Sequence, residues 1–200
     1  DIAKKYGVDI LRLWVVTADY QSDIKLSEDM LKQLSESYRK IRNTARYILG
    51  NISDFEPDTN SVKYEDMLEI DKWALMKLEK LVDKVTKAYE DYEFHIIFHA
   101  IHNFCVVDMS NFYLDIAKDR LYCTGEKSLD RRAAQTTMYY ILSAVSRLIA
   151  PVLSFTAEEI WKYMPHPASD DKRSIMMNDM PSAIDVQVDS AFTEKWDMIY

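Results

Sequence analysis

The chain has 200 residues, with 25 lysines and arginines against 33 aspartates and glutamates, so its formal net charge is -8. A hydrophobic content of 48% excludes a disordered chain and is enough to bury a core. Three glycines and two cysteines argue against a turn-rich barrel or sandwich and against a disulfide framework.

The longest apolar stretch, residues 139–155, is interrupted by Arg147 and Pro151, so we expect no membrane span. The two cysteines, Cys105 and Cys123, form no CxxC pair, and this suits a reducing compartment. The first residues lack the apolar region of a signal peptide. We therefore expect a cytoplasmic protein.

Two short helices hinged at Gly7 are predicted at the start of the chain, within residues 1–20. The stretch from Val8 to Trp14 is too densely apolar for an exposed helix and is expected to pack onto another element. The chain begins without a methionine, and we expect it to be a piece of a longer protein.

A long amphipathic helix is predicted after Ser27, which is a good N-cap and is followed by Glu28 and Asp29. Gly50 is expected just past its end, in a left-handed conformation. A loop follows over residues 51–61. The apolar positions that recur every three or four residues are Leu31, Leu34, Tyr38, Ile41, Ala45 and Ile48.

Three further long helices are predicted over residues 71–92, 93–118 and 129–149. Thr156 and Glu159 read as a capping box that opens a short helix ending near Pro165. Residues 174–181 are expected to be extended, and the last ten residues to begin another helix. The fold class predicted is all-α, an antiparallel helical bundle.

Cationic side chains are concentrated on one flank of the helix after Ser27. On a wheel of about 100° per residue, three arginines and an asparagine occupy the arc beside the apolar face, and Lys40 lies in the same segment. The residues are Arg39, Lys40, Arg42, Asn43 and Arg46. Three readings are open: a solvated face, arginines paired with acids of a neighbouring helix, or a stripe that follows the phosphates of RNA.

Three histidines, His95, His99 and His102, share one face of the predicted third helix, near Cys105 and Asp108. That spacing can hold a metal, but the surrounding apolar residues favour histidines that donate within the core. We expect no metal site.

Two other groups of residues attract attention. Asp119 to Arg132 is expected to form a structural charge cluster that joins two helices. Most of the 13 tyrosines are expected in the core, while Trp161 and Tyr163 are weaker candidates for exposed rings that stack on bases.

Catalytic motifs such as a phosphate-cradling glycine loop, GxSxG or HExxH are missing, so the chain alone is expected to be non-catalytic.

Four long segments resemble isoleucyl-tRNA synthetase of the bacterial type, in order and over nearly the whole chain. They are "YGVDILRLWVV" (6–16), "DYQSDIKLSEDMLKQLSESYRKIRNTARYILGNISDF" (19–55), "EFHIIFHAIHNFCVVDMSNFYLDIAKDRLYC" (93–123) and "RRAAQTTMYYILSAVSRLIAPVLSFTAEEIW" (131–161). Two departures stand out: Gln21 replaces a usual arginine, and Met180 replaces a usual aromatic. Valyl-tRNA synthetase is similar around residues 39–51, but less so over 99–116.

The resemblance implies the helical anticodon-binding domain of that enzyme. Residues 1–26 would be junction helices that follow the catalytic domain, residues 27–165 the anticodon-binding bundle, and residues 166–200 a truncated C-terminal extension. The five residues of the cationic flank would face tRNA(Ile). The catalytic and editing domains of the same chain would be partners, and the enzyme would be a monomer.

The intact enzyme would use ATP and magnesium to activate isoleucine and transfer it to tRNA, and its cysteine-rich carboxyl-terminal region would hold zinc. None of these cofactors is expected in this part of the chain. A different class of function also stays open, because ten methionines and an apolar amino-terminal stretch suit a module that docks protein helices in a groove.

Overall fold

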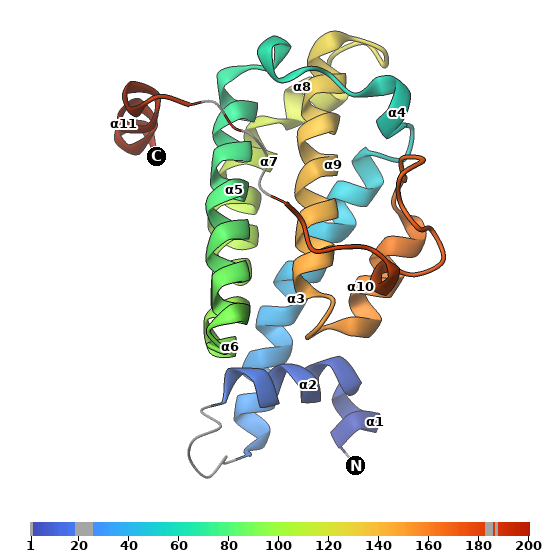
Figure 1. Cartoon of the computed structure of the whole chain (residues 1–200), viewed down its shortest axis with the longest axis vertical. Helices are drawn as coiled ribbons and strands as arrows, with labels where there is room; N and C mark the ends of the chain where they lie inside the picture. Colours follow the sequence, from blue (N-terminus) through green and yellow to red (C-terminus); the bar gives the residue numbers. More distant parts are fainter. Residues whose placement is uncertain (1, 19–25, 183–185, 187) are drawn as a thin grey trace.

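The computed structural model describes residues 2–18, 26–182, 186 and 188–200, and every regular element in these ranges is helical (Figure 1). This confirms the predicted all-α class. The α-helices are α1 (Ile2–Tyr6), α2 (Val8–Thr17), α3 (Glu28–Asn51), α4 (Pro57–Asn60), α5 (Glu69–Glu90), α6 (Phe94–Asn103), α7 (Leu114–Ile116), α8 (Lys118–Tyr122), α9 (Leu129–Ile149), α10 (Ser154–Tyr163) and α11 (Ser190–Ile199). Two 3-10 helices, η1 (Tyr64–Asp66) and η3 (Ile175–Met177), and a π-helix, η2 (Phe104–Tyr113), complete the set.

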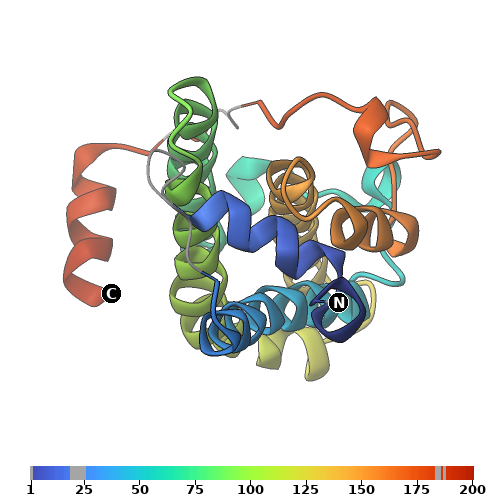
Figure 2. The same cartoon turned by 90° about the horizontal axis from the view of Figure 1, so that it is seen from below.

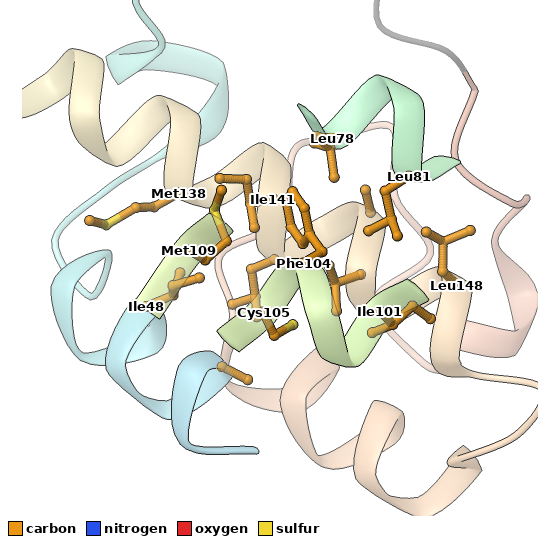
Figure 3. Packing of buried hydrophobic residues seen from close by; sticks show 14 of the residues in the cluster. Ile48, Leu78, Leu81, Ile101, Phe104, Cys105, Met109, Met138, Ile141 and Leu148 are labelled. Atoms are coloured by element: carbon orange, nitrogen blue, oxygen red, sulfur yellow. The ribbon is translucent and has the colours of Figure 1, made fainter. Parts of the chain in front are cut away.

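The helices α3, α5, α6 with η2, and α9 run up and down the long axis of the molecule and form the bundle (Figure 1). Helix α2 crosses its lower end, and α10 lies beside α9 (Figure 2). Helix α9 is buried along most of its length, and Met138, Ile141 and Leu148 meet apolar side chains from α5, α6 and η2 (Figure 3). The core is therefore continuous along the bundle.

The first two helices meet at Gly7, as predicted. Gly7 has φ of 92°, a value that L-residues with a side chain rarely adopt, and it bends the chain between α1 and α2. Helix α2 buries Ile10 and Leu13 against the bundle. Asp9 fixes its position by accepting the backbone amide of Thr156 at 2.7 Å, at the start of α10. Gln21, the first departure noted above, lies outside the described residues.

The predicted start of α3 is confirmed and its predicted end is wrong. Ser27 Oγ accepts the amide of Met30 at 3.2 Å, as an N-cap should. Gly50, however, is inside the helix, which runs to Asn51, and the amide of Ile52 still donates to the carbonyl of Ile48 at 3.0 Å. The helical hydrogen bonds continue through the glycine, so Gly50 does not end α3.

The segment predicted as one helix over 93–118 contains a change of helix type. Helix α6 widens into η2, a π-helix of 10 residues, before α7. Thr44 of α3 packs there, with its Oγ1 2.9 Å from Ser110 Oγ and 3.3 Å from the carbonyl oxygen of Cys105. Wide turns of this kind are rare, and they occur frequently at functional sites.

Two shorter predictions are also wrong. Helix α10 begins at Ser154, and Thr156 lies within it, where its hydroxyl donates to Asp9 at 2.5 Å instead of capping the helix. Residues 174–181 include the 3-10 helix η3 rather than an extended piece. The predicted terminal helix is present as α11.

Helix α11 packs on α5 through aromatic rings. The rings of Trp73 and Trp196 are 5.7 Å apart, and Tyr200 contacts Trp73 at 5.1 Å.

Among the described tyrosines, Tyr113 and Tyr139 are buried and five are exposed, so the expectation that most tyrosines are core is wrong. The charge cluster predicted over residues 119–132 is structural, as expected, but the acid that its arginine binds is Asp54 and not Asp119. Arg131 donates to both carboxylate oxygens of Asp54, at 2.7 and 3.0 Å.

Candidate nucleic-acid interface

The five residues predicted from sequence lie together on the solvent-facing side of α3. Arg39, Lys40, Arg42, Asn43 and Arg46 are all exposed. None of their side chains has a hydrogen-bond or ion-pair partner within the part of the chain that the structure describes. We call these five residues the α3 stripe. The alternative that they pair with acids of neighbouring helices is wrong for the described residues.

The remaining arginines behave differently, and the contrast is informative. Arg12 donates to the carbonyls of Pro151 and Val152. Arg131 pairs with Asp54, and Arg147 with Asp170 at 2.8 Å. A chain with an excess of acids has therefore paired its structural arginines and left those of the α3 stripe free for an external anion.

The packing of α3 explains why the stripe faces outward. Ile41, Thr44, Ala45 and Ile48 of this helix are buried, at the spacing of three or four residues that defines one helical face. The stripe occupies the remaining arc of the helix, which faces the solvent. Neighbouring guanidiniums at this spacing repel each other, and a bound polyanion relieves that repulsion.

A groove opens along one edge of the stripe, between α1, α2, α3 and α10, with a volume of about 690 Å³. Arg42 and Arg46 line one wall of this α3–α10 groove, and Phe155, Glu159 and Tyr163 line the other. Phe155 and Tyr163 are 65% and 63% exposed. Free guanidiniums opposite exposed rings are a combination that suits an unstacked base with its phosphates.

The prediction of two exposed rings was half right. Tyr163 is exposed, as expected, and it lines the groove. Trp161 is 1% exposed and donates from Nε1 to the carbonyl of Asp171 at 3.2 Å, so it is a core residue and not a stacking platform. Phe155 was missed, because a single phenylalanine near a predicted helix start gives no signal of exposure.

Two shallower pockets follow the other edge of the stripe, of about 220 and 480 Å³, and both are lined by Asn43 and Tyr47. Lys118 and Tyr122 come to these pockets from α8. The Tyr122 hydroxyl lies 3.5 Å from that of Tyr47, and burial, followed by the bond to Tyr122, raises the pKa of Tyr47. The Tyr47 hydroxyl, which accepts this bond, therefore keeps its own proton and can donate it to a ligand. No pattern in the sequence singles out Tyr122.

The three histidines do not form a metal site. No group of three or more histidine, cysteine, aspartate or glutamate side chains converges anywhere in the described ranges. His95 and His99 are exposed and His102 is half-buried, so the expectation of core donors is wrong for the first two. Asp108 pairs with Lys77 at 3.1 Å instead of facing a metal.

Among the described helices, none is both long and apolar enough to cross a bilayer.

A helical bundle with an outward stripe of unpaired cations, flanked by exposed rings, has the features of an RNA-binding domain. Residues 71–199 match the family described as the anticodon-binding domain of tRNA ligase. The chain belongs to that family. The match begins at α5, so the α3 stripe lies outside the matched residues.

The curated relatives extend the likeness to α3. The chain is 57% identical over 200 residues to isoleucine--tRNA ligase of Caldicellulosiruptor bescii, a match that covers 100% of the chain and 22% of the relative. It is 55% identical over 197 residues to the ligase of the same name from Syntrophotalea carbinolica, with 98% and 21% covered. The chain therefore spans about a fifth of the length of these relatives. This favours the isoleucine enzyme over the valine one.

A solved structure shares the fold. The crystal structure of a ternary LeuRS–tRNA–LeuAMS complex from Agrobacterium radiobacter K84 superposes with a TM-score of 0.65, covering 91% of this chain and 20% of that one. The identity is 14%, so this likeness establishes the arrangement of helices alone.

Proposed function

We propose that the chain is the anticodon-binding part of an isoleucine–tRNA ligase, and that the α3 stripe binds the backbone of tRNA(Ile). The observation that carries the proposal is the exposure of Arg39, Arg42 and Arg46 without any acidic partner in the described residues, in a chain with a net charge of -8. Guanidinium groups match phosphate oxygens in a two-pronged geometry. The negative charge elsewhere on the protein disfavours other orientations of a polyanion.

Binding would divide between position and recognition. Phosphate contacts from the stripe would set the position of the RNA along α3. Bases freed from stacking in the anticodon loop would then reach the rings of Phe155 and Tyr163 in the α3–α10 groove, where Glu159 can accept hydrogen bonds from base donors. On the other edge, Asn43 and Tyr122 would offer further hydrogen bonds.

The chemistry would belong to the rest of the ligase. In the whole enzyme, isoleucine would be activated with ATP and magnesium and then transferred to the tRNA, in catalytic and editing domains of the same polypeptide. Nothing in this chain fits ATP, because its sequence has three glycines and no phosphate-cradling loop. We also propose that zinc would bind in a different region, and that the enzyme is a cytoplasmic monomer.

The domain would contribute to the reaction through binding energy. Contacts made far from the reacting atoms position the acceptor end of the tRNA in the catalytic domain, and this raises the rate of transfer. The isolated chain would therefore bind tRNA without supporting isoleucine-dependent exchange of pyrophosphate into ATP.

The test replaces Arg39, Arg42 and Arg46 by alanine and measures affinity for a tRNA(Ile) transcript across a series of salt concentrations. The slope of log affinity against log salt should fall by about 2 to 3 units, since each lost phosphate contact removes roughly 0.7–0.9. A matched control replaces three exposed lysines elsewhere, Lys63, Lys127 and Lys172, by alanine. An unchanged slope in the arginine variant, or an equal fall in the control, would refute the proposal.

A further inference from the structure

A second groove with a cationic lining lies between α5 and α6, away from the α3–α10 groove. Its volume is about 570 Å³. We call it the α5–α6 groove. Its polar lining comes from both helices: Lys77, Lys80, Lys84, His95, His99 and Asn103. Asp108 of η2 is the one carboxylate among its described lining residues.

The charges of this groove do not cancel. Lys77 is already engaged, 3.1 Å from Asp108 and 4.3 Å from the centre of the Tyr200 ring. Lys80 and Lys84 are exposed and, within the described ranges, have no ion-pair partner. Ammonium groups four residues apart on a helix repel each other. Two free positive charges therefore remain on the α5 wall.

The α6 wall adds further hydrogen-bond donors. His95 and His99 are exposed, are four residues apart and face the lysines across the groove, with the amide of Asn103 beyond them. Both walls of the groove therefore present donors to an anion.

The groove is connected to the α3 stripe through His102. Burial lowers the pKa of His102, and the charge of Lys40 and then that of His99 act in the same direction. Helix α6, which forms one wall of the groove, packs against both α5 and α3. Figure 2 shows the segment of α6 and η2 next to α3 (light blue).

We propose that the α5–α6 groove is a second binding surface for the phosphates of the RNA that the α3 stripe binds. The inference rests on the proposed function, since it takes the same partner. A phosphate backbone is the occupant that the charges favour, because it presents anions at regular intervals to both the stripe and the groove. An acidic peptide could bind one of these surfaces without reaching the other.

The first experiment changes Lys80 and Lys84 to glutamine in the 200-residue chain. Affinity for a tRNA(Ile) transcript is measured over a salt series, and the slope should fall by about 1.4 to 1.8 units. The control changes two exposed lysines outside both grooves, Lys63 and Lys172, to glutamine and should keep the full slope. A full slope in K80Q/K84Q overturns the inference. If R39A/R42A/R46A still lowers the slope in that case, the proposed function stands alone.

The second measurement is circular dichroism, which checks that each variant is folded, as the exposed positions of the changed residues favour.

Two competitors identify the occupant. Inorganic phosphate at the same total phosphate concentration should displace the transcript far less than an unlabelled tRNA does, because a free phosphate ion cannot contact the stripe and the groove at once. A poly-glutamate peptide should also compete weakly. If the peptide instead displaces the transcript, K80Q/K84Q shows whether this displacement depends on Lys80 and Lys84. If the variant weakens displacement by the peptide as much as it weakens tRNA binding, RNA is the wrong occupant.

Discussion

The buried ion pair between Asp71 and Arg120 should dominate the stability of the upper end of the bundle. Asp71 is fully buried and accepts two bonds from Arg120, at 2.8 and 2.7 Å, and one from the Tyr113 hydroxyl at 2.6 Å. The Arg120 side chain is 11% exposed. These contacts join α5 to η2 and α8.

Changing Asp71 to asparagine removes the charge and leaves the guanidinium buried without a counter-ion. The free energy of unfolding should fall by about 3–5 kcal/mol, the cost of breaking one side of a buried pair. This is a large share of the roughly 5–15 kcal/mol that stabilises a domain. Urea denaturation followed by circular dichroism measures the change as a lower midpoint at constant slope.

A double variant tests the reasoning behind that number. Asp71→Asn combined with Arg120→Met removes both charges, so most of the lost stability should return. A single variant that costs less than about 1 kcal/mol would show that the pair is not desolvated in the way the burial implies. A double variant as unstable as the single one would show that packing, and not the unpaired charge, sets the cost.

Three further predictions concern other parts of the chain. The hydrogen bond from Arg131 lowers the pKa of Asp54 to about 2, with help from Gln135 and Arg132 and against the effect of burial. The ionised Asp54 therefore stabilises the fold fully above the ordinary pKa near 3.8, and this stabilisation is lost as the pH falls toward 2. The Asp54 side chain is 30% exposed, so solvent screens the interaction and this amounts to about 1 kcal/mol. D54N should therefore flatten the pH dependence of unfolding between pH 4 and 2. Gly7→Ala meets no atom within 4 Å but must adopt φ of 92°, so it should destabilise the chain by about 1–2 kcal/mol, measured by urea denaturation; no loss would contradict the left-handed geometry. Replacing both Phe155 and Tyr163 by alanine should weaken binding of a tRNA(Ile) transcript by about 2–6 kcal/mol without changing the salt slope, and a changed slope would contradict a stacking role.

The cationic side of the candidate site was predictable because it is local. The helical period alone places Arg39, Arg42 and Arg46 beside the apolar face of α3, whatever the rest of the chain does. The grooves were not predictable in this way. Tyr38 meets Thr156, a residue 118 positions away, and a single sequence does not say which distant helix supplies the opposite wall.

The errors in helix boundaries have a related cause. Thr156 has the sequence features of a capping residue, yet its hydroxyl serves Asp9 of α2. Gly50 has the features of a helix end, yet the helical bonds extend past it to Ile52. In both cases a local preference worth about 1 kcal/mol yields to longer-range packing. The π-helix was missed because α and π turns both leave apolar residues four or so positions apart.

The contact between Trp73 and Trp196 supplies a built-in optical probe. Two indole rings 5.7 Å apart, with Tyr200 and Phe112 beside them, form an asymmetric cluster that contains half of the four tryptophans in the chain. Release of α11 from α5 would change its near-ultraviolet dichroism and its emission, while the bundle keeps its helical signal. Detachment of the last helix can therefore be followed spectroscopically, without any label.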